Sequence, residues 1–282
     1  MPTAIGSKVI FMDLFSSYAS DDAAFQVAGP APRDYTEDFN LLRQLLFPAQ
    51  WGRDAGDRHT HLRLREDLLH RLAAQLPDAS IEALLGQLPG IRETLKTDVQ
   101  AAYAGDPAAK SYTEIIRAYP GFQATMVHRV VHELYVQGSD EALLYARELQ
   151  EYAHSRTGID IHPGASIGGH FFIDHGTGVV IGETAEIGDW VRIYQGVTLG
   201  VLHFEKDKNG DGTVLVKGNK RHPTLGSHVV IGAGAKVLGP VSIGDHVNIG
   251  ANAWIDEDIQ PYTTVFVAEH PRLERRSRTG KG

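Results

Sequence analysis

Apolar residues in the first half of the chain recur three or four positions apart, which is typical of helices that bury one face. Prolines interrupt these runs, and because a helix usually ends before a proline, we expect separate helices between them. The apolar runs are Leu68, Leu69, Leu72 and Leu76, then Ile81, Leu84, Leu85 and Leu88, then Ile91, Leu95 and Val99, and the prolines are Pro77, Pro89 and Pro107.

Two longer helices are expected before the middle of the chain. One covers residues 112–136 with a break at Pro120-Gly121, because proline cannot continue the helical hydrogen-bond pattern. The other covers residues 140–156 and ends at Gly158, since glycine readily takes the left-handed conformation that closes a helix.

A different period begins after Gly158, where aliphatic residues stand six positions apart in three uninterrupted groups. Neither the helical period of 3.6 nor the alternation of a strand produces this step. Short fixed repeats predict a solenoid, in which each coil buries its aliphatic residues against the neighbouring coils. The thirteen positions are Ile161, Ile167, Ile173, Ile181, Ile187, Ile193, Leu199, Leu225, Ile231, Val237, Ile243, Ile249 and Ile255.

The glycines support the same prediction. Of 30 glycines, 19 fall in residues 158–256, where they let the chain turn sharply between faces. Three six-residue sides make one coil of a triangular prism. This pattern resembles the hexapeptide repeat of left-handed parallel β-helices, and the handedness is what that resemblance implies. Further buried positions are expected two residues before the first set, at Val191, Val197, Val229, Ala235, Val241, Val247 and Ala253.

We therefore expect an α+β multidomain chain. An α-helical N-terminal domain covers residues 1–157, a left-handed parallel β-helix covers 158–260, and a C-terminal tail covers 261–282. The repeat is interrupted twice, by two extra residues between 173 and 181 and by a polar loop ejected at about 201–222. Functional residues often lie at such interruptions.

Composition limits the chemistry. With 42% hydrophobic residues among 282, the chain is too apolar for global disorder, and a formal net charge of −8 gives no overall attraction to nucleic acid. No run approaches the roughly 18 apolar residues of a membrane span, and the first twenty residues lack the order of a secretion signal, so we expect a cytoplasmic protein without membrane contacts. The chain has no cysteine, which excludes disulfides and a covalent thiol intermediate.

Three short motifs carry candidate chemistry. They are Asp160-Ile161-His162-Pro163, Asp174-His175-Gly176-Thr177-Gly178 and Arg221-His222-Pro223. With these motifs, the region from residue 106 to 271 resembles the serine O-acetyltransferases, hexapeptide-repeat enzymes that move acetyl from acetyl-CoA to L-serine ahead of cysteine synthesis. Hexapeptide repeats alone occur in several enzyme classes, so the specificity of the resemblance comes from the motifs.

Acetylating a hydroxyl requires a base, and histidine suits this role because its pKa lies near working pH. A carboxylate on the other ring nitrogen orients such a base and stabilises the imidazolium. The resemblance implies that His175 is the base and Asp160 its partner, in direct transfer between the two substrates. They stand 15 residues apart, under one coil, so neighbouring coils can bring them to one corner. Capping of a turn and a strand is the alternative for these residues.

The charges of serine suggest its binding groups. An ammonium is bound by carboxylates, and a carboxylate is bound by a guanidinium in a bidentate manner. The resemblance implies Asp106 and Asp174 for the ammonium, and Arg221 with His222 for the carboxylate and hydroxyl. An ordinary helix start is the alternative for Asp106, which precedes Pro107.

The resemblance also implies that acetyl-CoA lies in a groove between β-helices of neighbouring subunits. Gly200, Ala233 and Ala251 match the wall of that groove, although the fold itself also requires small residues. The lysines of the ejected loop are further candidates for the CoA phosphates, with a solvated surface as the alternative; they are Lys206, Lys208, Lys217 and Lys220.

No metal is expected. The loop contains Asp207, Asn209, Asp211 and Gly212, as at the start of an EF-hand loop, but Gly218 stands where a bidentate glutamate is needed. A zinc site needs about three convergent ligands. His128 and His132 are four residues apart, and we expect them to belong to a helix face.

The resemblance implies a homotrimer with shared grooves, and a dimer of trimers is left open. Many relatives end in an isoleucine that enters O-acetylserine sulfhydrylase. This sequence ends in Gly282, so we do not expect that route to a complex. Two other functions stay open: acetyl transfer to another small acceptor, such as homoserine or a sugar, and a non-catalytic regulatory subunit of cysteine synthesis.

Overall fold

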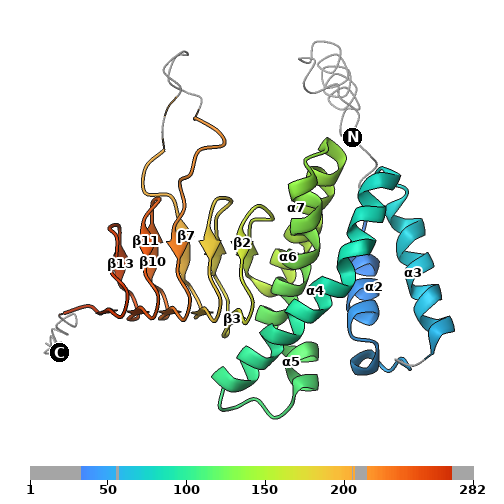
Figure 1. Cartoon of the computed structure of the whole chain (residues 1–282), viewed down its shortest axis with the longest axis horizontal. Helices are drawn as coiled ribbons and strands as arrows, with labels where there is room; N and C mark the ends of the chain where they lie inside the picture. Colours follow the sequence, from blue (N-terminus) through green and yellow to red (C-terminus); the bar gives the residue numbers. More distant parts are fainter. Residues whose placement is uncertain (1–32, 55–56, 205, 207–214, 269–282) are drawn as a thin grey trace, which may run out of the picture. The chain divides into compact units, whose positions relative to one another are not determined.

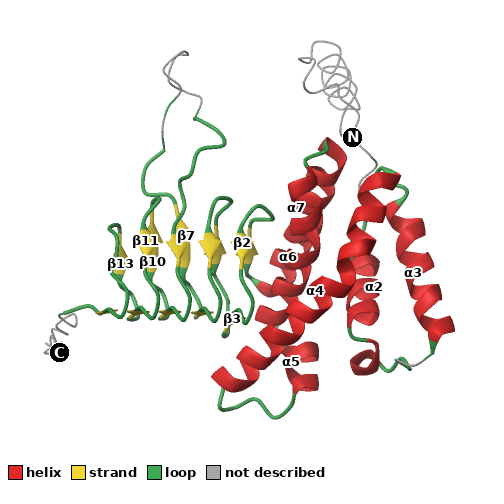
Figure 2. Cartoon of the chain, in the orientation of Figure 1, coloured by secondary structure: helices red, strands yellow, loops and turns green. Residues whose placement is uncertain are grey.

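The computed structural model describes residues 33–54, 57–204, 206 and 215–268. The chain divides into two compact units, residues 1–33 and 34–282. All helices and strands of the described residues lie in the second unit, with the helices first and the strands after them (Figures 1 and 2). From the sequence we predicted a domain boundary between residues 157 and 158. That boundary falls inside the second unit, and it stays a prediction.

The helical part has its long helices packed side by side. Helix α4 packs against α6, and α6 packs along α7. The helices are α2 (Thr36–Leu46), α3 (Arg58–Leu72), α4 (Asp78–Gly105), α5 (Tyr112–Ala118), α6 (Pro120–Gln137) and α7 (Asp140–Thr157), with a 3-10 turn η2 (Pro48–Trp51) after α2. Among the described residues, none of these helices is long and apolar enough to cross a membrane.

Helix α4 corrects the expectation that the helix would end before Pro89. It runs for 28 residues through Pro89 without stopping. The buried positions Ile81, Leu84 and Leu88 continue directly into Ile91 and Leu95 on the same face. Pro89 lies on the exposed side, where the carbonyl group left without an N–H partner can be hydrated. Packing of the continuous apolar face therefore outweighs the local cost of the proline.

The other two predictions about helix ends are confirmed. Helices α5 and α6 are separated at Tyr119, and Pro120 is the first residue of α6, where its missing N–H costs nothing. Helix α7 ends at Gly158, which has a φ of 69°, so glycine closes the helix as expected.

Short parallel strands form three sheets around a common core. In sheet A the order is β1-β4-β7-β10-β13, in sheet B it is β11-β8-β5-β2, and in sheet C it is β14-β12-β9-β6-β3. The strands are β1 (Asp160–Ile161), β2 (Ser166–Ile167), β3 (Phe172–Ile173), β4 (Val180–Ile181), β5 (Glu186–Ile187), β6 (Arg192–Ile193), β7 (Thr198–Gly200), β8 (Thr224–Leu225), β9 (Val230–Ile231), β10 (Lys236–Leu238), β11 (Ser242–Ile243), β12 (Asn248–Ile249), β13 (Trp254–Ile255) and β14 (Thr264–Val265).

The six-residue period is confirmed position by position. Every one of the thirteen aliphatic residues is the second residue of a strand, and all are buried except Ile167, which is half-buried. Val180 pairs with Thr198, and Lys236 with Trp254, so a regular coil takes 18 residues. The fold is the expected left-handed parallel β-helix behind a helical segment.

The two interruptions lie on two different edges of the prism. The first follows β3 in the turn from sheet C to sheet A, where His175, Gly176 and Gly178 have φ values of 58°, 92° and 76°. The second leaves β7 and returns before β8, in the turn from sheet A to sheet B. We call these the His175 edge and the Arg221 edge.

The third edge, between sheets B and C, carries a stack of aromatic side chains. Each residue has a φ near 58°, and neighbouring rings from successive coils lie 4.0 to 6.2 Å apart at their centroids. The stacked residues are His170, Trp190, His228, His246 and Tyr262. This edge packs rings against rings, and in its turns the carboxylates of Asp189 and Asp245 accept backbone N–H groups.

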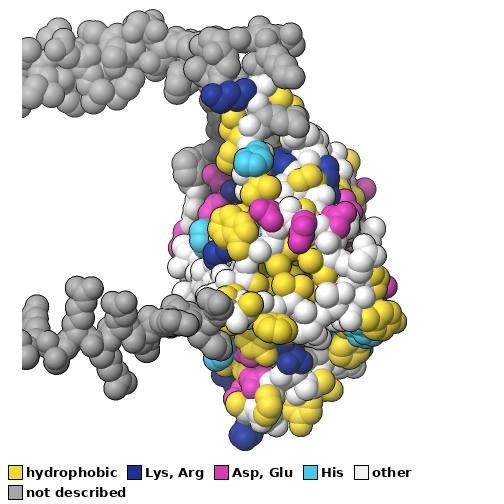
Figure 3. Space-filling view, turned by 90° about the vertical axis from the view of Figure 1, so that its left-hand side faces the viewer, with side chains coloured by type: hydrophobic (Ala, Val, Ile, Leu, Met, Phe, Trp, Pro, Cys, Tyr) yellow, Lys and Arg dark blue, Asp and Glu magenta, His cyan; other side chains and the backbone are white. Residues whose placement is uncertain are grey.

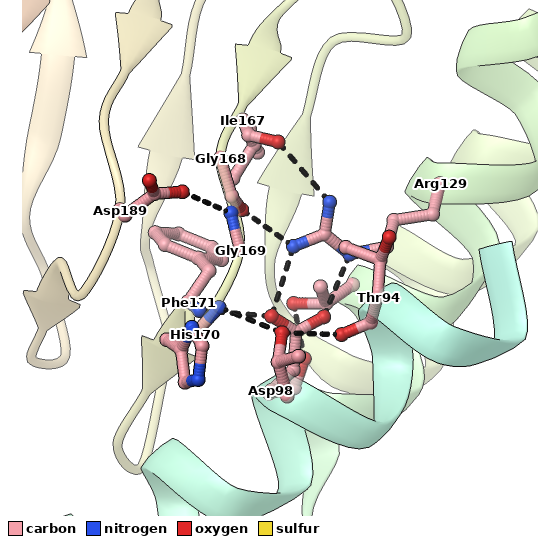
Figure 4. Close-up of polar contacts among 12 residues, drawn as sticks. Thr94, Asp98, Arg129, Ile167, Gly168, Gly169, His170, Phe171 and Asp189 are labelled. Carbon is pink, nitrogen blue, oxygen red and sulfur yellow. Dashed lines mark hydrogen bonds and ion pairs between the residues drawn. The ribbon is translucent and has the colours of Figure 1, made fainter. Parts of the chain in front are cut away.

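A buried ion pair joins the helices to the first coil (Figure 4). Arg129 of α6 donates to both carboxylate oxygens of Asp98 of α4, at 2.6 and 2.9 Å. The same guanidinium donates to the carbonyls of Ile167 and Gly168, and Asp98 accepts from the N–H of Phe171. These contacts fix the C-terminal half of α4 against the β-helix, and Asp106 follows that half directly.

The last coils expose apolar side chains at the far end of the β-helix. Figure 3 looks onto that end, and hydrophobic side chains are spread among polar ones there. Among the described residues the exposed large side chains at this end are Trp254, Tyr262, Phe266 and Val267.

Candidate active site

His175 stands at the start of the turn that leaves β3. Its side chain is 71% exposed, and its Nε2 lies 3.9 Å from Oδ1 of the neighbouring Asp174. Asp174 is only 16% exposed, and its backbone N–H donates to the carbonyl of Ile193 on the next coil. A mostly buried carboxylate therefore lies beside an accessible imidazole on the His175 edge.

Asp106 joins this group from the end of α4. Its Oδ2 accepts a hydrogen bond from the Tyr119 hydroxyl at 2.5 Å, and its Oδ1 accepts one from the N–H of Ala108 at 2.7 Å. The bond from Tyr119, with smaller contributions from His175 and Arg192, holds the pKa of Asp106 below its ordinary value. Asp106 is therefore ionised at neutral pH and lies near His175.

Asp160 lies on the same edge, but its carboxylate has different neighbours. Its N–H donates to the carbonyl of Val179 in the His175 turn. Burial raises the pKa of Asp160, and His154 of α7 opposes that rise while Glu151 adds to it. Within the described residues, no hydrogen bond or ion pair joins Asp160 to His175. The pairing of these two residues stays a prediction.

Arg221 is held on the Arg221 edge by an acidic partner. Its guanidinium donates to Oε2 of Glu183, and the Tyr135 hydroxyl donates to Oε1 of Glu183 at 2.9 Å. Burial acts to raise the pKa of Glu183, but the bonds from Arg221 and Tyr135 outweigh it, so the pKa lies below its ordinary value. Glu183 is thus a charged support that orients the guanidinium.

His222 is buried next to Arg221. Its Nδ1 accepts from the N–H of Thr184 at 3.1 Å, so Nε2 carries the proton when the ring is neutral. Burial first, and then the charge of Arg221, lowers its pKa to about 4. The ring packs directly on Gly182, where a Cβ atom would lie 2.0 Å from Nε2. His222 is therefore a neutral hydrogen-bond donor at pH 7.

A cavity of about 410 Å³ opens beside Arg221 beneath the two ends of the ejected loop. Its walls combine charged and apolar side chains from β-helix and loop, among them Glu183, His203, Phe204, Lys217, Asn219 and Arg221. Lys220 is engaged within the chain, since its Nζ donates to the carbonyl of Thr184 and pairs with Glu186.

The small residues expected along acetyl-CoA lie on both edges. Ala233 and Ala251 occupy the turn from sheet C to sheet A on successive coils, and the carbonyl of Ala233 accepts from Asn252. Gly200 ends β7 on the Arg221 edge. Lys206 forms an isolated bridge with Leu215. Lys208, the EF-hand-like residues 207–212 and the tail from 269 onward lie outside the described residues.

The described residues contain one group with the spacing of a metal site. Ligand atoms of Glu151, His154 and Asp160 all lie within 4.8 Å of one another. His128 and His132 belong to a helix face, with ring centroids 5.6 Å apart, and His132 contacts the carbonyl of Pro163 at 2.8 Å.

Taken together, the structure gathers Asp106, Asp174 and His175 on one edge and Arg221 with His222 on another. Four residues around them were not predicted from the sequence: Tyr119, Glu183, Thr184 and Arg192. Two sequence features could have pointed to some of them: the tyrosine before Pro120, and the polar pair Glu183-Thr184 in a turn of the repeat.

Two family models match the chain. Residues 59–126 match the N-terminal domain of serine acetyltransferases, and residues 222–257 match the bacterial transferase hexapeptide with six repeats. A plasmid-encoded serine acetyltransferase of Synechococcus elongatus is 51% identical over 192 residues, covering 68% of this chain and 57% of its own length. A serine acetyltransferase of Mycobacterium tuberculosis is 51% identical over 171 residues, covering 61% of this chain and 68% of the relative.

Solved structures of serine acetyltransferases match over a larger share of the chain. The structure of Entamoeba histolytica serine acetyltransferase isoform 3 in complex with cysteine has a TM-score of 0.73 and 45% identity, over 94% of this chain and 93% of that one. The Neisseria gonorrhoeae enzyme in complex with serine has a TM-score of 0.58 and 29% identity, over 85% and 98%. Identity at this level across nearly the whole of both chains means that this chain belongs to the serine acetyltransferase family.

Proposed function

We propose that the chain transfers acetyl from acetyl-CoA to the hydroxyl of L-serine, giving O-acetyl-L-serine and CoA. The observation that carries this proposal is the cluster of Asp106 and Asp174 beside an accessible His175, in a chain of this family. Two carboxylates suit the ammonium of an amino acid, and the imidazole is placed to take a proton from its hydroxyl.

The reaction proceeds directly between the two substrates. His175 accepts the hydroxyl proton while the serine oxygen forms a bond to the acetyl carbonyl carbon. The tetrahedral intermediate then expels CoA as its carbon–sulfur bond breaks, and the imidazolium returns the proton to the thiolate. Holding both substrates in one groove supplies much of the acceleration, since orientation can be worth roughly 7 to 11 kcal/mol.

Asp160 orients His175 in this proposal. The two residues lie on one edge of the prism, and the backbone of Asp160 is hydrogen-bonded within the His175 turn. A carboxylate partner fixes the tautomer of the base and stabilises its charged form. In this proposal the exposed His175 side chain turns toward the Asp160 carboxylate.

Arg221 and His222 bind the serine carboxylate and hydroxyl side. Arg221 is a fixed guanidinium and His222 a neutral donor. Because they lie on a different edge of the prism from His175, the proposal requires a site shared between copies of the chain. The His175 edge of one copy then faces the Arg221 edge of the next, which closes into a trimer. A dimer of trimers is the larger assembly consistent with this arrangement.

Acetyl-CoA lies in the same shared groove. Ala233 and Ala251 line it from the His175 edge, and Gly200 lines it from the Arg221 edge. The cavity beside Arg221 gives space for part of the cofactor chain. We place the enzyme in the cytoplasm, where acetyl-CoA is available, and we place O-acetylserine sulfhydrylase downstream as the consumer of its product.

The test is thiol release with acetyl-CoA and a panel of acceptors on the full-length chain. L-serine should be the best substrate, and L-homoserine and sugars should give little CoA. His175→Ala should abolish release while its circular dichroism matches the wild type. Preference for homoserine or a sugar would favour a different acetyltransferase, and no release with any acceptor would favour a regulatory subunit. Adding L-cysteine tests whether the ligand of the Entamoeba structure also inhibits this chain.

A further inference from the structure

We infer that Tyr119 is a positioning residue for Asp106, and that the Tyr119–Asp106 pair makes the site select acceptors that carry a primary ammonium. The inference rests on the proposed function, because Asp106 is taken to bind that ammonium. It adds a residue that contacts neither the expected base nor the carboxylate-binding Arg221.

The position of Tyr119 is set by the local sequence. Tyr119 is extended, with a ψ of 118°, because the ring of the following Pro120 excludes the helical conformation from the residue before it. Gly121 then packs directly on the first coil, where a Cβ atom would lie 2.1 Å from the carbonyl oxygen of Ile173. Ile173 immediately precedes Asp174 and His175, so the Tyr119 turn is pressed against the candidate site.

The contacts of Asp106 leave its carboxylate with little freedom. One oxygen accepts from the Tyr119 hydroxyl and the other from the N–H of Ala108. Each oxygen keeps a lone pair for another donor. An ammonium ion supplies up to three donors, so it can bridge Asp106 and Asp174.

The surroundings of Asp106 explain why a donor is needed there. Burial acts to raise the pKa of Asp106. The Tyr119 hydroxyl, followed by the Ala108 N–H and the charges of His175 and Arg192, outweighs that effect. The charge of Asp174 also acts on Tyr119, more weakly than those of Asp106 and Glu114. Arg192 fits because Gly105 lacks a side chain: a Cβ atom there would lie 2.5 Å from its Nη2.

The test compares Tyr119→Phe with a matched control, Tyr112→Phe. Tyr112 is a nearby tyrosine that is 48% exposed, and its ring packs edge-on against that of Tyr103. In Tyr119→Phe we expect KM for L-serine to rise about tenfold, because a hydrogen bond to a charged group is lost. The kcat and the KM for acetyl-CoA should change less than about threefold, since catalysis and CoA binding do not involve Asp106. Tyr112→Phe should behave as the wild type.

The pH profile separates positioning from general damage. Without the Tyr119 hydroxyl, the pKa of Asp106 rises, so serine binding measured by calorimetry should begin to weaken at a higher pH than in the wild type. In an Asp106→Asn background the Tyr119→Phe change should have no further effect, because the acceptor of its bond has lost its charge. Unchanged KM and an unchanged pH dependence of serine binding would overturn the inference.

Direct binding keeps this inference separate from the proposed function. Calorimetry with L-serine measures the affinity of the wild type and of both variants, with glycolate as a hydroxy acid that lacks the amine. If the wild type binds serine but releases no CoA, the proposed function is overturned and the inference is decided by the binding ratio. Equal serine affinity in wild type and Tyr119→Phe overturns the inference whatever the activity. A wild type that binds glycolate as tightly as serine overturns it too.

Discussion

At the scale of single residues, two histidines on the Arg221 edge are held neutral by burial. His222 and His162 both have pKa values lowered to about 4, with burial as the main cause. In each case Nδ1 accepts a backbone N–H, from Thr184 and from Gly164 respectively. Protonation would therefore cost both the desolvation of a charge and a hydrogen bond.

These histidines predict that the protein is less stable in acid. Unfolded histidine has a pKa near 6.5, so between about pH 6.5 and 4 the unfolded chain binds more protons than the folded one, and stability falls as pH falls. Because both rings keep some solvent contact, we expect a loss of only about 1 kcal/mol from each. Urea unfolding at about pH 7 and about pH 5 measures the loss.

The control for this prediction is a chain without the two rings. In a His162→Gln, His222→Asn double variant the free energy of unfolding should depend less on pH over the same window. Equal pH dependence in the variant and the wild type would show that other groups are responsible.

The sequence alone identified the site residues that belong to motifs. It did not identify the residues that hold them in place. Asp174 and His175 are identifiable because they interrupt a strict repeat. Tyr119 and Asp106 are 13 residues apart on different helix ends, and Arg221 and Glu183 are 38 apart across an ejected loop. No local pattern records such pairs, because they form only when α4, α6 and the coils are packed together.

At the scale of elements, the Asp98–Arg129 pair joins the helices to the β-helix. Its two side chains are 2% and 8% exposed, so removing one charge leaves the other buried and unpaired. We expect Asp98→Asn to lower the free energy of unfolding by about 3 to 5 kcal/mol. Chemical denaturation measures this loss of stability. The substitution should also raise the KM for serine, since Asp106 lies at the end of the same helix.

A surface pair on α4 is the matched control. Glu93 and Lys96 form an exposed ion pair, with side chains 63% and 45% exposed, and Glu93→Gln should cost no more than about 0.5 kcal/mol. A similar small cost for Asp98→Asn would contradict the role given to the buried pair.

The elements themselves were predictable to different degrees. The six-residue step predicted thirteen of the fourteen strands of the described residues, all but β14, because each coil buries the same side chain by the same geometry. Pro89 misled because its helix-breaking effect is local, whereas the face from Ile81 to Leu95 is stabilised by α2, α3 and α6 around it. Tertiary packing reinforces a periodic pattern such as the six-residue step. It can override the effect of a single residue such as Pro89.

At the scale of the whole molecule, the two halves of the proposed site lie on different edges of one prism. Asp174 and His175 occupy the turn from sheet C to sheet A, and Asp106 joins them from the end of α4. Arg221 and His222 precede β8 in the turn from sheet A to sheet B. Sheet A separates these edges within a chain. A complete serine site therefore requires two copies in this proposal, and that requirement can be tested directly.

Complementation between two inactive variants tests the shared site. His175→Ala damages only the first edge and Arg221→Ala only the second, so each homotrimer should be inactive. In mixed trimers from co-expression, a site formed by the His175 edge of the Arg221→Ala chain and the Arg221 edge of the His175→Ala chain is intact. Random mixing at equal amounts makes about a quarter of the sites intact, so about a quarter of wild-type activity should return.

Co-expression of His175→Ala with Asp106→Ala should restore none, because both changes damage the same edge. Mixed trimers that form by mass measurement yet stay inactive would mean that each site is built within one chain.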